Sequence, residues 1–321
     1  MTTAAADGAS TAPGGLDVRG VHGGPDVPGV SGGLDVPAVR SGTVGAVAWA
    51  SAGDPGSAAT PVLLLHGVSD SGECWDPVVR HLASERLVVT VDARGHGRTP
   101  LGDEPFTMAA LAHDAVDVLR EVVGRPAVVV GHSMGALVAE EIALSEPDLV
   151  RALVLEEPGW HTPVGASVDG VPTFLAAFFA SFAGVPAHAL ERWSQAENPA
   201  WPDDEHAPWA HAKTQVDQRL ARTPQDWGGR DWVEDLALVT CPITLISGAP
   251  ERGSVVTADA RARAAELLGD GLVDVQLATV GHNARREDRA GFLAALDAAL
   301  DGVPDGMPGA MPDAEPARTV R

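Results

Sequence analysis

The stretch that most constrains the fold is the apolar run at residues 127–130, which enters the motif Gly131-His132-Ser133-Met134-Gly135. A helix-compatible segment, 136–145, follows at once. A strand that turns this sharply into a helix strains the backbone at the central serine and lifts its hydroxyl above the sheet edge. Gly131 and Gly135 suit such a turn because strand and helix approach too closely for larger side chains. The sequence therefore predicts a nucleophile elbow centred on Ser133.

Two further apolar runs end in glycine-rich loops. Residues 61–65 indicate a buried strand that ends in His66-Gly67-Val68, and residues 87–91 indicate a second that leads into the loop 92–99. Other strands are expected at 44–50, 152–155, 243–246 and 272–277, and helices at 75–84, 107–123, 257–268 and a last one ending near 300. Because the strands are continuously apolar and alternate with helices, they predict a mostly parallel sheet covered on both faces.

These motifs, spread over roughly residues 44–300, resemble the α/β-hydrolase superfamily. The resemblance implies an α/β fold with a doubly wound sheet and a helical cap inserted after the strand that follows the nucleophile helix. It implies that the backbone N–H groups of Val68 and Met134 form the oxyanion hole, and that the loop 92–99 is structural support. It also requires a base on the loop after the last strand, where His282 is the single histidine of the last hundred residues.

The acid that would orient His282 has two candidates, at positions that different branches of the superfamily use. Glu157 ends the strand 152–155, and Glu251 follows the strand 243–246. Glu157 is preferred because it lies where its strand leaves the core, and burial of a carboxylate without a role would be costly. Glu251 is the alternate. It ranks second because the neighbouring Arg252 can pair with it and keep it at the surface as a solvated loop charge. Strand alternation predicts that Glu156 faces away from Glu157.

The residues at the elbow indicate acyl chemistry. A serine hydroxyl is a weak nucleophile at neutral pH, so Ser133 needs a base, and His282 would take its proton and return it to the leaving group. The expected function is that of a serine hydrolase that cleaves a small to medium apolar carboxylic ester or lactone through an acyl-enzyme. Hydrolysis of a carbon–carbon bond and acyl transfer are alternatives with the same residues, and a non-catalytic ligand-binding protein is a further one.

No cofactor or metal is predicted, because the histidines and cysteines lack the spacing of metal ligands and no dinucleotide fingerprint opens a helix. The formal net charge of −22 and the single lysine, Lys213, argue against a nucleic-acid partner. The most apolar segment, 173–185, is shorter than the roughly 20 residues that cross a bilayer, so it indicates a lid helix and not a membrane anchor. The expected partner is a small-molecule substrate.

The composition also suggests how the chain is organised. Residues 1–42, which are rich in Gly and Pro and carry a loose nine-residue repeat, and the Pro-rich tail 301–321 are predicted to be disordered. The hydrolase core is assigned to 43–157 and 236–300. Residues 158–235 form the predicted cap, which holds every tryptophan except Trp49 and Trp75. Two cysteines without a pairing pattern and the lack of a secretory signal near Met1 favour a cytoplasmic protein.

Overall fold

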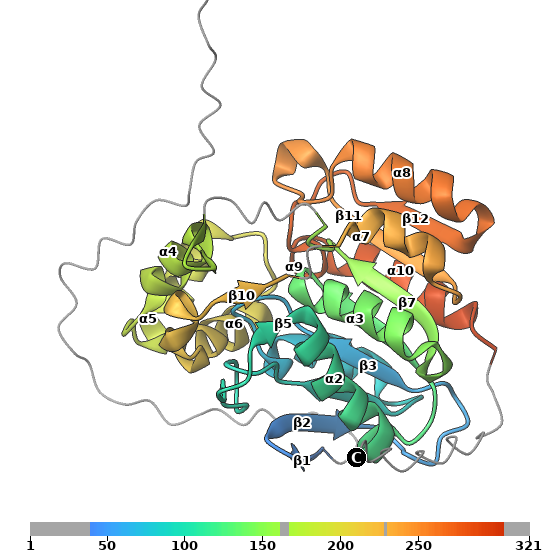
Figure 1. The fold of residues 1–321 in the computed structure, drawn as a ribbon, viewed down its shortest axis with the longest axis horizontal. Coiled ribbons are helices and arrows are strands. Elements are labelled where there is room, and N and C mark those ends of the chain that lie inside the picture. Colours follow the sequence, from blue (N-terminus) through green and yellow to red (C-terminus); the bar gives the residue numbers. More distant parts are fainter. Residues whose placement is uncertain (1–38, 161–166, 228–229, 305–321) are drawn as a thin grey trace, which may run out of the picture. The chain divides into compact units, whose positions relative to one another are not determined.

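The computed structural model describes residues 39–160, 167–227 and 230–304. Its main element is an eight-stranded sheet with the strand order β1-β2-β4-β3-β6-β7-β11-β12 (Figure 1). The strands are β1 (Arg40–Val44), β2 (Val47–Ala52), β3 (Val62–Leu65), β4 (Val88–Val91), β6 (Ala127–His132), β7 (Val150–Glu156), β11 (Ile243–Ser247) and β12 (Leu272–Gln276). Only the pairs β1–β2 and β2–β4 of this sheet are antiparallel, so the predicted mostly parallel sheet is confirmed.

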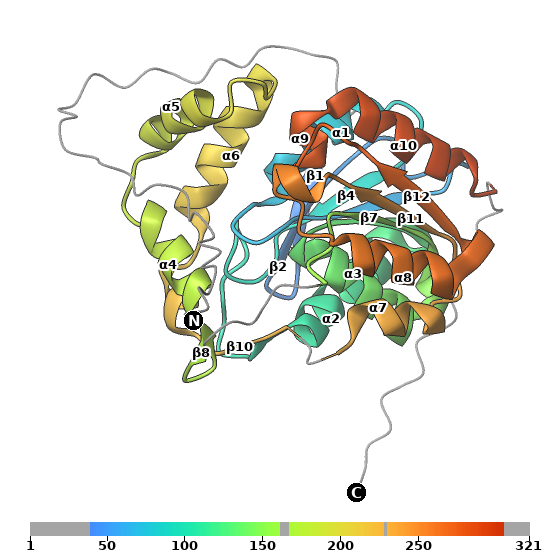
Figure 2. The same cartoon turned by 90° about the horizontal axis from the view of Figure 1, so that it is seen from above.

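Helices cover both faces of the sheet (Figure 2). They are α1 (Asp76–Leu82), α2 (Met108–Val118), α3 (Met134–Ser145), α7 (Trp232–Asp235), α8 (Ala258–Leu268), α9 (Ala284–Glu287) and α10 (Arg289–Asp301). Side chains of α2, α3 and α8 pack into one core, and those of α1 and α10 into another. Along β3, Leu63 and Leu65 enter the first core while Val62 and Leu64 enter the second. This two-sided burial is why the strand is continuously apolar.

The helical cap contains α4 (Thr173–Phe182), α5 (Ala187–Glu197) and α6 (Asp203–Gln215), inserted after β7 as predicted. These helices lie together to one side of the sheet (Figure 2). Several cap aromatics form an apolar core, with Phe179 fully buried, while Trp193 and Trp209 stack with ring centroids 5.5 Å apart. Short strands accompany the cap: β5 (Phe106–Thr107) pairs with β10 (Gln225–Asp226), and β8 (Ser167–Val168) with β9 (Val171–Pro172).

Some element boundaries differ from those expected. The single strand expected at 44–50 is a hairpin of β1 and β2, because residues 40–44 pair one by one with residues 47–51. The first strand therefore begins at Arg40, inside the segment 1–42 that was predicted to be disordered, and α10 continues to Asp301. Disorder was predicted for both ends of the chain. Most of that prediction falls on residues 1–38 and 305–321, which lie outside the described residues. At the end of the predicted cap, α7 packs against α8 of the core.

Within the described ranges, no single helix is long and apolar enough to cross a membrane, although α4 and α5 together pass a test of length and composition with a 112° bend between them.

Candidate active site

The turn between β6 and α3 is built around Ser133. Its backbone has φ 52° and ψ −112°, in a region that residues other than glycine rarely adopt. The flanking glycines leave no room for a side chain: a Cβ atom would lie 2.3 Å from the Gly135 carbonyl oxygen at Gly131, and 2.2 Å from the Leu65 carbonyl oxygen at Gly135. The structure thus has the sharp strand-to-helix turn that the motif predicts.

His282 lies on the loop between β12 and α9, and its ring joins two of the predicted residues. Its Nε2 is 3.1 Å from Ser133 Oγ, and its Nδ1 is 3.3 Å from Glu157 Oε2. Because an ionised carboxylate only accepts hydrogen bonds, Nδ1–H donates to Glu157, which leaves Nε2 to accept from the Ser133 hydroxyl. The His282 side chain is 31% exposed, so solvent reaches this line of contacts.

Glu157 directly follows β7 and its side chain is fully buried. Besides His282, its carboxylate accepts hydrogen bonds from the backbone N–H groups of Gly248 and Val255, both at 2.7 Å, and from the Ser254 hydroxyl at 2.6 Å. Burial raises the pKa of Glu157, but the hydrogen bonds from His282, Ser254 and Gly248 outweigh it and hold the pKa below its usual value. The carboxylate beside His282 is therefore ionised.

The alternate acid lies elsewhere. Glu251 is in the single-turn helix η6 (Pro250–Arg252), where its side chain is exposed, and it is Glu157 that contacts His282. Glu156 faces away from Glu157, as strand alternation predicts: its carboxylate accepts from the Arg285 backbone N–H at 2.8 Å and from Arg285 Nη1 at 2.9 Å.

The two amides expected to form an oxyanion hole belong to Met134, the residue after the serine, and to Val68 on the loop after β3. Met134 is the first residue of α3, where backbone N–H groups have no partner within the helix. Val68 follows Gly67, whose ideal Cβ position is 3.3 Å from Ser133 Cβ, so the loop after β3 passes beside the serine. Within the part of the chain that the structure describes, neither amide donates to a protein acceptor. Their role as an oxyanion hole stays a prediction.

Two histidines of the motifs organise the surrounding loops. His132 is buried, which lowers its pKa well below the usual value, and its Nε2–H donates to the His282 carbonyl oxygen at 2.9 Å. His66 accepts from the Ala93 N–H at 3.0 Å and donates from Nδ1 to the Gly67 carbonyl oxygen at 2.8 Å. These contacts hold the loops that carry His282 and Val68.

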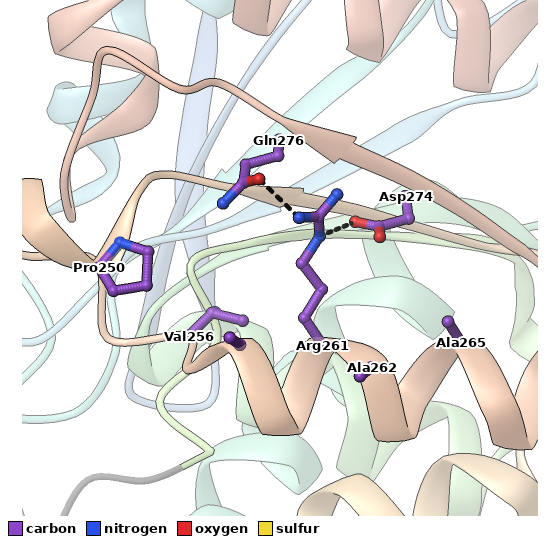
Figure 3. Close-up of a pocket in the computed structure, with 8 residues that line it drawn as sticks. Pro250, Val256, Arg261, Ala262, Ala265, Asp274 and Gln276 are labelled. Carbon is purple, nitrogen blue, oxygen red and sulfur yellow. Dashed lines mark hydrogen bonds and ion pairs between the residues drawn. The ribbon is translucent and has the colours of Figure 1, made fainter.

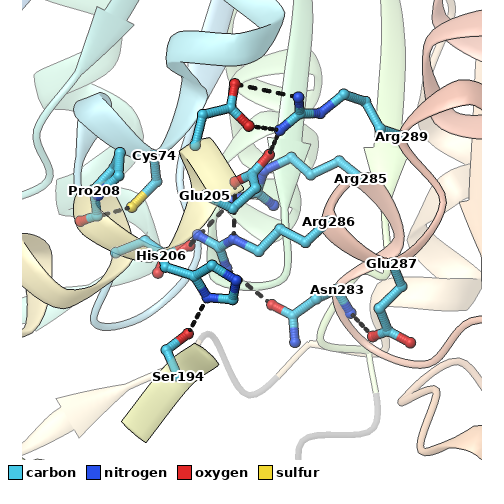
Figure 4. A network of polar contacts seen from close by, with 12 residues as sticks. Cys74, Ser194, Glu205, His206, Pro208, Asn283, Arg285, Arg286, Glu287 and Arg289 are labelled. Atoms are coloured by element: carbon cyan, nitrogen blue, oxygen red, sulfur yellow. Dashed lines mark hydrogen bonds and ion pairs between the residues drawn. The ribbon is translucent and has the colours of Figure 1, made fainter. Parts of the chain in front are cut away.

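A buried ionic network beside the site was not foreseen from the sequence. We call its centre the Asp70 cluster: Asp70, Lys213, Arg285 and Arg286, all buried. Glu156 and Glu205 extend it, and Figure 4 shows Arg286 and Arg289 reaching toward Glu205. No local spacing signals such a network, because its members come from segments far apart in the chain.

A cavity of about 310 Å³ lies away from Ser133, between α8 and β12 (Figure 3). Arg261 crosses it to Asp274 at 2.7 Å and to Gln276 at 2.6 Å. None of Ser133, His282 and Glu157 lines it, so it is not part of the candidate site. Across the described ranges, no three His, Cys, Asp or Glu side chains are grouped in a way that could hold a metal ion.

The helix that begins at the elbow carries a buried acid, Glu140. The Trp160 indole N–H donates to its Oε1 at 2.6 Å, and burial raises the pKa of Glu140 well above its usual value despite this bond. The folded protein therefore keeps this carboxyl neutral at pH values where the unfolded chain ionises it. The stability that this group contributes is present below the unfolded pKa and is lost as the pH rises toward the folded one.

We expect Glu140→Gln, which keeps the oxygen that Trp160 contacts, to raise stability at pH 8 and to have no such effect at pH 4. A gain of about 1 kcal/mol would raise Tm by roughly 2–4 °C. Thermal unfolding between pH 4 and pH 9 measures this, with the exposed Glu121→Gln as the matched control. Equal pH dependence of Tm in Glu140→Gln and the wild type would contradict a neutral Glu140.

Comparisons with known proteins agree with this geometry. Residues 62–296 match the model of the alpha/beta hydrolase family. Lipase LipV of Mycobacterium tuberculosis is 40% identical over 97 residues, 30% of this chain and 36% of the lipase. The putative carbamate hydrolase RutD of Enterobacter cloacae is 37% identical over 109 residues, 34% of this chain and 41% of that protein.

These matches span less than half of either curated relative. Among solved structures, the enol-lactonase of Burkholderia xenovorans superposes with a TM-score of 0.66 at 19% identity, covering 82% of this chain and all of the lactonase. That likeness concerns the fold. The family model matches most of this chain, and the structure has the same fold. This chain therefore belongs to the alpha/beta hydrolase family.

Proposed function

We propose that this hydrolase cleaves small to medium apolar carboxylic esters or lactones through an acyl-enzyme on Ser133. The observation that carries the proposal is the line of contacts from Ser133 Oγ through His282 to the buried, ionised Glu157. A nucleophile, a base within hydrogen-bond reach and a group that orients the base are the parts that acyl transfer needs.

The reaction would begin when His282 Nε2 takes the Ser133 proton as Oγ attacks the acyl carbon. The carbonyl oxygen becomes an oxyanion, which the N–H groups of Val68 and Met134 stabilise, each donor being worth roughly 3 kcal/mol. Collapse breaks the acyl–oxygen bond, and His282 gives its proton to the departing alcohol. Water then loses a proton to His282 and adds to the acyl carbon, and Ser133 leaves with that proton restored.

The substrate class rests on three observations. A serine hydroxyl attacks an electrophilic carbonyl carbon, and both esters and lactones contain such a carbon bonded to an alkoxy oxygen. Similar proteins are named as a lipase and an enol-lactonase. The cap is rich in aromatic side chains, including the half-buried stacked pair Trp193 and Trp209, which supports an apolar acyl or alcohol group.

The experiment that tests this proposal is intact mass after incubation with a fluorophosphonate, with wild type and Ser133→Ala compared. We expect a single adduct on the wild type and none on the variant, because an activated serine attacks phosphorus and retains the phosphonyl group. The exposed Ser181→Ala is the matched control and should label like the wild type. A folded wild type that takes up no probe and hydrolyses no p-nitrophenyl ester would contradict the proposal and favour a binding protein of the same fold.

A further inference from the structure

The Asp70 cluster connects the segments that carry the proposed reaction. Asp70 lies two residues after Val68, on the loop of residues 66–71 between β3 and the single-turn helix Gly72–Trp75; we call it the oxyanion loop because it carries the proposed donor Val68. Arg285 and Arg286 lie in α9, three and four residues after His282. Lys213 comes from α6 of the cap. One carboxylate therefore joins the oxyanion loop, the histidine loop and the cap.

Lys213 makes two contacts with the oxyanion loop. Its Nζ lies 2.9 Å from Asp70 Oδ1 and 3.1 Å from the Ser69 carbonyl oxygen. Ser69, the residue directly after Val68, has φ 66°, in the left-handed region that a serine rarely adopts. Such a conformation persists only where the surroundings hold it. The ammonium group of Lys213, bound to the carbonyl oxygen of that residue, is one such restraint.

Lys213 is one of three buried cations that surround the Asp70 carboxylate. Asp70 also accepts from Arg285 Nη2 at 3.1 Å and from Arg286 Nη2 at 2.9 Å. Burial alone raises the pKa of Asp70, but Arg286, Lys213 and Arg285 hold it well below its usual value. The two other carboxylates have cations of their own: Arg285 pairs with Glu156, and Arg286 and Arg289 pair with Glu205. Loss of Lys213 removes one of the cations that compensate the buried Asp70 carboxylate, which the interior solvates poorly, and takes the ammonium donor from the Ser69 carbonyl oxygen.

We propose that Lys213 is a positioning residue that ties the cap helix α6 to the Ser69–Asp70 peptide and so fixes where the Val68 amide points. This inference rests on the proposed function, in which that amide stabilises the oxyanion. An amide moved away from the oxyanion weakens binding of the transition state more than binding of the substrate. Disturbing Lys213 should therefore lower kcat and leave KM nearly unchanged.

Steady-state hydrolysis of p-nitrophenyl butyrate tests this with Lys213→Met, which keeps most of the length of the unbranched side chain and removes its charge. Complete loss of one oxyanion donor costs about 10²–10³ in kcat, so a displaced donor should cost about 10–100-fold, with KM within about threefold of the wild type. The control is Arg80→Met. Arg80 of α1 makes an exposed ion pair, at 2.6 Å, with Asp204 in the first turn of the same cap helix, whereas Lys213 lies in its last turn. Arg80→Met should leave kcat unchanged.

Hydrogen–deuterium exchange of peptides spanning residues 66–72 is the second measurement. Lys213→Met should exchange faster there than the wild type, and Arg80→Met should not. The proposal is overturned if the exchange rate of this segment is unchanged in Lys213→Met, or if the variant raises KM and leaves kcat at the wild-type value. If Lys213→Met does not fold, Lys213→Gln replaces it. Its amide keeps a donor for one of the two acceptors, and the proposal then requires a fall in kcat at constant KM.

The two proposals fail in different ways. A wild type that neither labels at Ser133 nor hydrolyses esters overturns the proposed function. The exchange comparison needs no turnover, so it still decides whether Lys213 holds the loop after β3.

Discussion

Replacing His282 with alanine is expected to lower kcat for ester hydrolysis by about 10⁶-fold. The ring is the group between Ser133 Oγ and Glu157, so its loss removes both the proton acceptor for attack and the donor for the leaving group. Steady-state kinetics with p-nitrophenyl butyrate, together with a rate of fluorophosphonate labelling, measures the effect. His113→Ala, at an exposed position of α2, is the control and should retain full activity.

Removal of both Ser133 and His282 should cost no more than removal of either, because the two act as a unit. The Ser133→Ala/His282→Ala double variant should therefore hydrolyse the ester at the same residual rate as each single variant. His282→Ala with kcat within tenfold of the wild type would contradict the assignment of the base. So would a double variant whose loss equals the product of the two single losses.

The parts of this site that are local in sequence could be predicted from it. The elbow follows from an apolar strand, two glycines with no space for a Cβ atom and a helix-compatible segment, all within some twenty residues. The opposite orientations of Glu156 and Glu157 follow from strand alternation, and the structure confirms them: one faces Arg285, the other His282. Successive side chains of a strand point to opposite faces because of the backbone conformation alone, so their directions can be predicted without knowledge of the tertiary structure.

The parts that depend on tertiary packing could not be predicted. The Asp70 cluster joins residues 70, 213, 285 and 286, and each of these charges taken singly looks like an ordinary surface residue. Their burial is decided by how α6 of the cap sits against the loop after β3, which no local pattern encodes. The same holds for the three donors that surround Glu157: Gly248, Ser254 and Val255 follow β11, and they approach the carboxylate only because β11 pairs with β7.

That shell of donors makes Glu157→Gln the sharpest test of the acid. A glutamine has one oxygen and one NH₂ group where the carboxylate has two acceptor oxygens. With its oxygen accepting from Gly248 N–H and the Ser254 hydroxyl, the NH₂ group takes the place of Oε2, where it faces His282 Nδ1 and loses the hydrogen bond from the Val255 N–H. His282 must then accept at Nδ1 and carry its proton on Nε2, toward Ser133. In this tautomer it cannot take the serine proton.

We therefore expect Glu157→Gln to lower kcat by about 10⁴-fold with little change in KM, as loss of the correct histidine tautomer does in serine hydrolases. Glu251→Gln, at the exposed alternate position, should stay within about twofold of the wild type. The two variants make the same chemical change at the two candidate acids, so the comparison decides between them. A large loss in Glu251→Gln with Glu157→Gln active would transfer the role to Glu251 and would require η6 to move toward His282.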